Sequence, residues 1–148
     1  GVSAWPVVAG CTLCETDGGS LVAQLAHCRV VRAHEPGFPA LYRVVSQSHV
    51  PEWTDLPEPE QQAVMRVVNT VERALRDSLR PTKINLATLG NVVPHLHWHV
   101  IARFDWDSHF PAPIWGQAQR AAAPAQLDEL ELLLPRVDKL LQQRLRDV

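Results

Sequence analysis

Clusters of hydrophobic residues along the chain predict four β-strands. Residues 25–33, 40–47, 83–90 and 95–103 are rich in apolar residues, chiefly Val, Leu, Ile and Ala, and are flanked by turn-forming or polar residues. Short apolar segments between turn-forming residues are typical of strands. The first two are separated by the sequence HEPGFP at residues 34–39, which favours a turn and an antiparallel pairing of these strands.

A helical period replaces the strand pattern in the middle of the chain. Apolar residues recur there at spacings of three and four, at Val64, Val67, Val68, Val71, Leu75 and Leu79. Charged residues occupy the opposite side, which predicts an amphipathic helix over residues 57–79. Thr54 or Asp55 is a candidate N-cap, acidic residues fill the first turn, and Pro81 is expected to stop the helix.

The C-terminal segment predicts a second amphipathic helix, over residues 127–145. We expect it to kink or split at Pro135, because an interior proline removes a helical hydrogen bond. The order of elements predicts an α+β fold, in which the long helix packs on an antiparallel sheet and a C-terminal helix follows. At 148 residues we expect one domain over residues 1–148, with a core at roughly 11–115 and a tail at 116–148.

Composition and charge restrict the classes of partner. Hydrophobic residues make up 46% and charged residues 20% of the chain, which is ordinary for a folded protein. The formal net charge of −2 gives no general attraction to nucleic acid, and no apolar run approaches the ~20 residues that span a membrane. Residues 1–11 end like a lipoprotein cleavage site but lack a basic segment, so we interpret the likeness as chance. We expect a cytoplasmic protein that binds neither nucleic acid nor membrane and needs no organic cofactor.

The sequence HLHWHVI at residues 95–101 places a histidine at every second position. Side chains alternate faces along a strand, so His95, His97 and His99 share one face, and Leu96 and its apolar alternates share the other. Three interpretations are open: solvated histidines on a sheet surface, a catalytic zinc site, or nucleophilic catalysis. An imidazole with an unperturbed pKa near ~6.5 is mostly neutral at pH 7 and can attack without a separate base.

The three cysteines indicate a second chemical feature. Cys11 and Cys14 form a C-x-x-C sequence, which is typical of metal or redox chemistry but is weak evidence alone. The alternative is a pair of buried or loop thiols. Cys28 lies in the apolar run HCRVV and is predicted to be a small core residue.

The histidine pattern resembles the signature of the histidine triad (HIT) superfamily, H-φ-H-φ-H-φ-φ with φ apolar. All seven positions of residues 95–101 match it, and the resemblance covers roughly residues 11–115. Gly90 and Asn91 stand where the family often has Gly-Gln, and Arg103 stands where it often has Pro-Arg. The resemblance implies a nucleotide hydrolase or nucleotidyl transferase that acts at the α-phosphate of a purine nucleotide, of the phosphoramidate or dinucleoside polyphosphate type.

The same resemblance implies roles for individual residues. His97 would attack the α-phosphorus and form a nucleotidyl-histidine, and His99 would contact phosphate oxygens or assist the leaving group. Asn85, Gly90 and Asn91 would help to hold the phosphate with aimed N–H groups. Family members are commonly homodimers, which we carry over as an expectation.

A zinc site is also implied by the resemblance. Some relatives hold zinc with a C-x-x-C pair, a histidine after the second strand and the first histidine of the triad. The matching residues of this chain are Cys11, Cys14, His49 and His95. A closed Cys2His2 set is structural rather than catalytic. His27 is an alternative ligand, although it lies inside a predicted strand.

Two positions depart from the family pattern. Val92 replaces a hydroxyl residue that contacts phosphate in many relatives, and Leu41 replaces a histidine at the start of a strand. These departures favour one alternative to the enzyme, a nucleotide-binding regulatory module with little turnover. A catalytic zinc enzyme with all three histidines as ligands is a further alternative that stays open.

Overall fold

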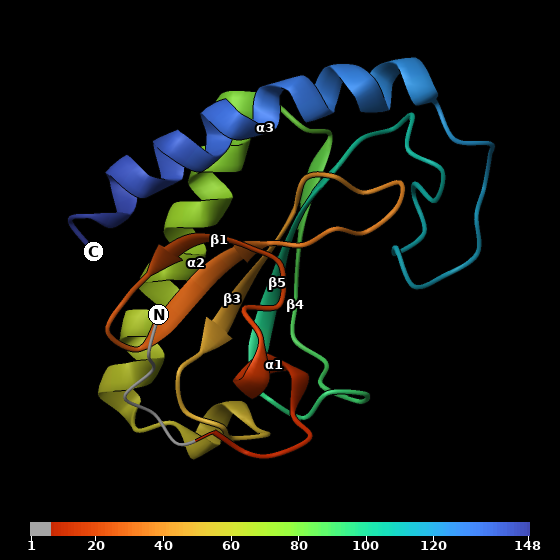
Figure 1. Ribbon diagram of the computed structural model, residues 1–148. Coiled ribbons are helices and arrows are strands. Elements are labelled where there is room, and N and C mark those ends of the chain that lie inside the picture. Colours follow the sequence, from red (N-terminus) through yellow and green to blue (C-terminus); the bar gives the residue numbers. More distant parts are fainter. Residues whose placement is uncertain (1–6) are drawn as a thin grey trace.

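A computed structural model describes residues 7–148 and contains one antiparallel five-stranded sheet (Figure 1). Its strands are β1 (Ser20–Gln24), β2 (Cys28–Arg32), β3 (Leu41–Ser46), β4 (Lys83–Ala87) and β5 (His97–Arg103), in the spatial order β1-β2-β3-β5-β4. All four neighbouring pairs are antiparallel, including the predicted pairing of β2 with β3. The α+β class is therefore confirmed. Most of the lipoprotein-like opening, at residues 1–6, lies outside the described residues.

The strand at the edge of the sheet, β1, was missed by the sequence-based prediction. Its residues 20–24 follow two glycines in a segment with a turn-forming composition. Only Val22 of β1 is buried, and the pairing with β2 is irregular between Leu21 and Ala23. A short, irregular edge strand with one buried residue lacks the alternating pattern that identifies a strand from sequence.

The long helix α2 (Glu58–Leu79) covers one face of the sheet. Five of the six predicted apolar residues are buried, whereas Leu79 is partly buried. Its predicted cap was wrong: Thr54 and Asp55 belong to a separate 3-10 turn, η1 (Trp53–Asp55), and Pro57 occupies the N-cap position of α2. The predicted stop before Pro81 is confirmed, because Arg80 takes a left-handed conformation with φ 47° and ends the helix.

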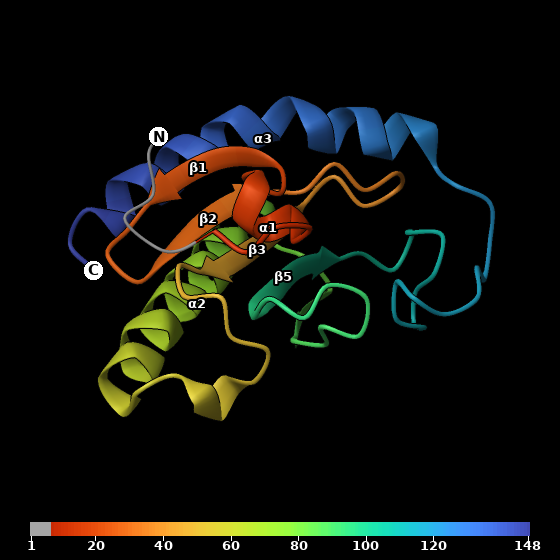
Figure 2. The same ribbon diagram turned by 60° about the horizontal axis from the view of Figure 1, so that its bottom comes forward.

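The C-terminal helix α3 (Pro124–Leu145) starts three residues earlier than predicted and continues through Pro135 without a break. It arches across the end of the sheet and packs on α2 (Figures 1 and 2). Its buried face consists of Leu130, Leu134, Val137, Leu141 and Leu145. Asp138 fastens it to the sheet, since its carboxylate accepts hydrogen bonds from Arg32 and from the Tyr42 hydroxyl.

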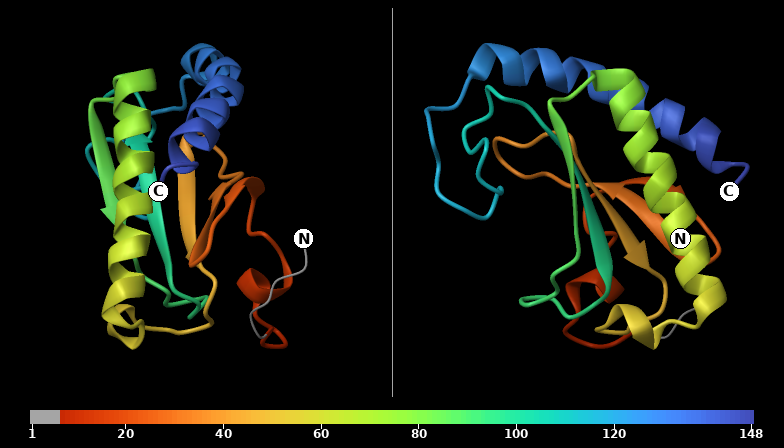
Figure 3. Two further views of the ribbon diagram at one scale, coloured as in Figure 1. Left: turned by 90° about the vertical axis from the view of Figure 1, so that its left-hand side faces the viewer. Right: turned by 180° about the vertical axis from the view of Figure 1, so that it is seen from behind.

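The two faces of the sheet have different cover. Trp98 and Val100 of β5 point toward α2, into the main hydrophobic core. The short helix α1 (Thr12–Glu15) lies on the opposite side of the sheet from α2 (Figure 3, left). We call this second side the histidine face, because the alternation along β5 places His97 and His99 on it. Among the described residues, no helix has the length and apolar character needed to cross a membrane.

Candidate functional site

His97 and His99 lie in the middle of the histidine face, as their alternation predicts. β3 borders β5 on one side, so that Val45 is opposite His97 and Arg43 is opposite His99. β4 borders it on the other side, with Ala87 opposite His99. The two imidazoles are close together, with ring centroids 5.0 Å apart, and the residues are 9% and 7% exposed. The interpretation as solvated surface histidines is therefore wrong.

His97 is held in one tautomer by its own strand. Its Nδ1 lies 2.5 Å from the carbonyl oxygen of His95, and a carbonyl can only accept. Nδ1 therefore carries the proton, and the Nε2 lone pair is left free. Burial lowers the pKa of His97 despite this hydrogen bond, and the nearby Arg43 guanidinium also lowers it. A neutral imidazole with a free Nε2 is the form that nucleophilic attack requires.

His99 has a different environment. Burial, the neighbouring His97 and the Arg43 charge lower the pKa of His99 to about 4. The imidazole is therefore neutral at pH 7. Its Nδ1 is buried without a hydrogen-bond partner among the described residues, and its ring lies 5.1 Å from the Trp115 ring in an edge-to-face arrangement. A neutral ring with an unused polar atom suits a hydrogen bond to substrate better than proton donation to a leaving group.

The four predicted zinc ligands come together at one end of β5. The donor atoms of Cys11, Cys14, His49 and His95 all lie within 4.8 Å of one another. His95 Nδ1 is 3.5 Å from the Cys11 Sγ, 3.4 Å from the Cys14 Sγ and 3.1 Å from His49 Nδ1. Both cysteines are free thiols, without a disulfide. Separations of this size fit the edges of a tetrahedron with metal–ligand bonds of about 2.0–2.3 Å.

The tautomer of His95 supports metal binding. Its Nε2 lies 2.7 Å from the Ser46 carbonyl oxygen, so that Nε2 donates and the Nδ1 lone pair points into the cluster. The set contains neither His97 nor His99. His27 is also outside it and lies 4.0 Å from Glu60 on α2. The donor set therefore fits a structural zinc ion and does not favour a catalytic zinc held by all three histidines.

Comparison with known families identifies the fold. A model of the HIT domain matches residues 17–106. The chain belongs to the HIT family. A comparison with curated proteins found no match.

Solved structures of HIT proteins have the same fold. A histidine triad protein from Bradyrhizobium japonicum is 29% identical, with a TM-score of 0.69, and the match covers 86% of this chain and 91% of that chain. A hypothetical histidine triad nucleotide-binding protein from Sulfolobus tokodaii is 18% identical, with a TM-score of 0.57 and coverage of 87% and 85%. A zinc-bound histidine triad family protein from Mycobacterium smegmatis is also 18% identical, with a TM-score of 0.56 and coverage of 87% and 85%. These last two likenesses show the fold alone.

The predicted phosphate-holding residues of this HIT protein lie on β4 and in the loop that follows it. Asn85 is on β4, opposite Ile101, and its Oδ1 accepts a hydrogen bond of 2.9 Å from Arg103. Gly90 adopts a φ of +76°, and Asn91 is exposed in the same loop. Val92, which replaces a hydroxyl residue, is 93% exposed. That Asn85, Gly90 and Asn91 contact a phosphate stays a prediction.

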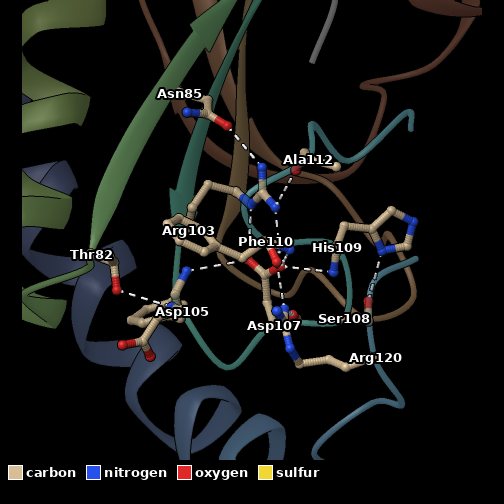
Figure 4. A network of polar contacts seen from close by, with 11 residues as sticks. Thr82, Asn85, Arg103, Asp105, Asp107, Ser108, His109, Phe110, Ala112 and Arg120 are labelled. Carbon is tan, nitrogen blue, oxygen red and sulfur yellow. Dashed lines mark hydrogen bonds and ion pairs between the residues drawn. The ribbon is translucent and has the colours of Figure 1, made fainter. Parts of the chain in front are cut away.

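A loop after β5 is ordered by a buried ion pair that the sequence did not reveal (Figure 4). The Asp107 carboxylate accepts hydrogen bonds of 2.8 and 3.0 Å from Nε and Nη2 of Arg103. It also accepts from the backbone N–H groups of Phe104, His109 and Phe110. Burial alone would raise the pKa of Asp107, but these hydrogen bonds lower it below its ordinary value.

The ordered loop brings Trp115 to His99 on the histidine face. The tryptophan is 52% exposed, although its ring contacts His99. An exposed aromatic ring beside His99 is a candidate stacking surface for a nucleotide base. The sequence around Trp115 and His109, DSHFPAPIWG at residues 107–116, indicates only a surface loop.

Two arginines of the histidine face were also missed. Arg29 of β2 donates hydrogen bonds to the carbonyls of Leu13, Thr16 and Asp17, and so attaches the segment around α1 to the sheet. Arg43 of β3 donates one hydrogen bond of 3.1 Å to the Gly18 carbonyl. The signal that could have found both is the alternation of their strands, because Arg29, Arg43 and the histidines fall on one face once the register is known.

Proposed function

We propose that this HIT protein is a nucleotide hydrolase or nucleotidyl transferase in which His97 attacks the α-phosphorus. The observation that supports the proposal most directly is the hydrogen bond from His97 Nδ1 to the His95 carbonyl. It fixes the proton on the nitrogen that faces the backbone and leaves Nε2 as a free nucleophile. The description of the Sulfolobus tokodaii relative as nucleotide-binding agrees with a nucleotide as the ligand.

The reaction proceeds in two displacements. The Nε2 lone pair of His97 forms a bond to the α-phosphorus, and the bond from phosphorus to the leaving group breaks with its electron pair. The leaving group takes a proton from solvent. Water or another acceptor then attacks the nucleotidyl-histidine, loses a proton, and returns His97 to the neutral form. His99 donates an N–H to the phosphate oxygens during both steps, where negative charge must be stabilised.

The cluster of Cys11, Cys14, His49 and His95 is proposed to hold a structural zinc ion. His95 would then have two functions: its ring would bind zinc, and its backbone carbonyl orients His97. The ion supplies folding energy when bound, because its ligands come from segments far apart in the sequence. Its position at the start of β5 supports the backbone that carries the nucleophile. The zinc-bound Mycobacterium smegmatis relative gives a precedent within the fold.

Two further parts of the proposal rest on the family resemblance: a purine nucleotide substrate of the phosphoramidate or dinucleoside polyphosphate type, and a homodimer. A cytoplasmic location and a single domain over residues 1–148 are proposed from the composition and length of the chain. The dimer does not follow from an uncovered helix face, because the apolar stripe of α2 is covered by the sheet and α3 of the same chain. Sedimentation at micromolar concentration tests it, and a mass near 16.5 kDa would indicate a monomer.

The experiment that tests the catalytic proposal is a quenched reaction followed by mass spectrometry. Wild-type protein is mixed with adenosine 5′-phosphoramidate, and the expected result is an adenylyl adduct on His97. His97→Asn should form no adduct and should lose turnover by several orders of magnitude, while its zinc content and thermal stability stay unchanged. His99→Asn is the matched control, since it should slow adduct formation by about 10²–10⁴ without moving the adduct.

A nucleotide-binding module gives a different result in the same experiment. It binds the phosphoramidate or the product AMP tightly, but no adduct appears on any histidine. The family departure at Leu41 favours this alternative on sequence grounds. In the structure Leu41 packs with Ala33 and Ile101 in an apolar cluster, and the backbone of His95 supplies the polar partner of His97. The departure at Leu41 therefore does not deprive the nucleophile of orientation.

A further inference from the structure

Arg43 is a permanent positive charge on the histidine face, directly beside the catalytic pair. It lies opposite His99 in the register of β3 and β5. Its charge contributes to the lowered pKa of both His97 and His99. A guanidinium stays protonated at any working pH. The charge of Arg43 is therefore always present where the proposed reaction places a phosphate.

Most of the hydrogen-bonding capacity of Arg43 is unused. Nη1 donates to the Gly18 carbonyl. The Nε atom is buried and has no hydrogen-bond partner among the described residues. No carboxylate in residues 7–148 forms an ion pair with this guanidinium, although five ion pairs occur elsewhere in that range. Nη2 donates to none of the described residues and is not buried, so this N–H group can donate to an anion.

The other arginines of the same sheet have more hydrogen-bond partners than Arg43. Arg29, also on the histidine face, donates three hydrogen bonds to backbone carbonyls. Arg103 is paired with Asp107 and also donates to Asn85 and Ala112. Arg32, on the opposite face, is paired with Asp138. An unpaired, partly buried guanidinium costs free energy, and an anionic ligand beside His97 and His99 would offset that cost.

We propose that Arg43 binds a nonbridging oxygen of the substrate phosphate through Nη2. This inference rests on the proposed function for the identity of the phosphate, and it deepens that function by naming a residue that recognises the phosphate charge. It assigns the contact that is missing at Val92, whose side chain is apolar and exposed, to a residue of the sheet.

A purely structural role for Arg43 makes a different prediction. In that case the residue would only attach Gly18 to the sheet, through the hydrogen bond from Nη1. Arg43→Gln separates the roles, since its amide can still donate to the Gly18 carbonyl but carries no charge. Arg43→Lys keeps the charge but lacks the planar guanidinium. Arg32→Gln is the matched control, because it removes an arginine charge from the opposite face of the same sheet.

The test compares the affinities of AMP and adenosine by calorimetry, on zinc-loaded wild type and the three variants. These ligands differ only in the phosphate, and neither requires turnover. We expect wild type to prefer AMP, Arg43→Gln to lose about 10- to 100-fold in AMP affinity with adenosine affinity unchanged, and Arg43→Lys to lose less. Arg32→Gln should keep the wild-type preference. Adduct formation on His97 is measured separately, so that a failure of the catalytic proposal is visible independently.

Each other outcome decides against the inference. If Arg43→Gln keeps the preference for AMP, Arg43 does not bind the phosphate, and the nucleophile assignment to His97 stands. If AMP and adenosine lose affinity equally, the residue acts only through the fold. If wild type shows no preference for AMP, the inference also fails. Should Arg43→Gln not fold, Arg43→Lys decides: a selective loss of AMP affinity supports the inference, and an unchanged preference contradicts it.

Discussion

Replacement of Asp107 by Asn should destabilise the protein through the loop after β5. Its carboxylate accepts two hydrogen bonds from Arg103 and three from backbone N–H groups. An amide is nearly the same size and retains one oxygen, so the substitution creates no cavity. It removes the negative charge, and its NH2 group cannot accept from the guanidinium. The Arg103 side chain, 2% exposed, then keeps its charge without a counter-ion.

The magnitude follows from the burial of the pair. Removing one partner of a buried ion pair costs about 3–5 kcal/mol in free energy of unfolding, because the remaining charge is uncompensated. The lower part of this range applies here, since Arg103 keeps the Asn85 Oδ1 and the Ala112 carbonyl as acceptors. For a chain of this length, a loss of about 3 kcal/mol lowers the melting temperature by roughly 6–12 °C.

Urea denaturation of wild type and Asp107→Asn measures the difference, with Asp77→Asn as the matched control. Asp77 forms an ion pair of 2.8 Å with Arg144, but both side chains are more than a third exposed, at 46% for Asp77 and 35% for Arg144. Such a surface pair contributes less than about 1 kcal/mol. Equal effects of the two substitutions would refute the reasoning that burial determines the cost.

The pH dependence provides a second check on Asp107. Its pKa in the folded protein is below the ordinary value of 3.8, so the charged form stabilises the fold at any pH above that ordinary value. This contribution is lost as the pH falls through the lower, folded pKa. The stability difference between wild type and Asp107→Asn should therefore be constant near neutral pH and shrink below about pH 4. A difference that grew on acidification would contradict the assigned sign.

Three further predictions concern the site. Protein purified without chelator should contain one zinc per chain, and Cys14→Ser should lose both zinc and thermal stability, whereas Cys28→Ser should keep the zinc; full zinc occupancy in Cys14→Ser would contradict the ligand set. Trp115→Ala should weaken adenosine binding by roughly tenfold through lost base stacking, with Trp115→Phe as the control, and unchanged affinity in both would remove the stacking role. His99 should stay neutral in a nitrogen-15 NMR titration down to about pH 5, since its pKa is about 4, and protonation near pH 6.5 would refute this.

The long elements of the fold were predictable from sequence because their patterns span many residues. α2 has six apolar positions in register, and each central strand has a run of β-branched residues. The ends of elements were less predictable, because they depend on local hydrogen bonds. Asp55 has the right chemistry for a helix cap, but its side chain closes the 3-10 turn with Glu52 instead. The proline at Pro57 then occupies the N-cap position of α2.

The site was predictable where the chemistry is encoded at fixed spacing. The triad and the C-x-x-C pair are short patterns, and the structure brings Cys11 and Cys14 to His95 across more than 80 positions of sequence. Residues that act through tertiary position were not predictable. The pairing of Arg103 with Asp107 looks like any i,i+4 charge pair in the sequence. Its importance comes from burial and from three backbone N–H groups, which sequence spacing does not reveal.

The alternation of three histidines on one strand gives each of them a different partner. His95, at the start of β5, has its Nδ1 in the cysteine cluster and its Nε2 on the Ser46 carbonyl. The next side chain on the same face belongs to His97, two residues further on. Its Nδ1 donates to the backbone carbonyl of His95. The ring that would bind zinc and the carbonyl that orients His97 therefore belong to one residue. The spacing of two residues allows one residue to serve both neighbours, since the intervening side chains of Leu96 and Trp98 point into the core. The metal cluster and the proposed nucleophile are in this way connected through the backbone of His95, without a shared ligand.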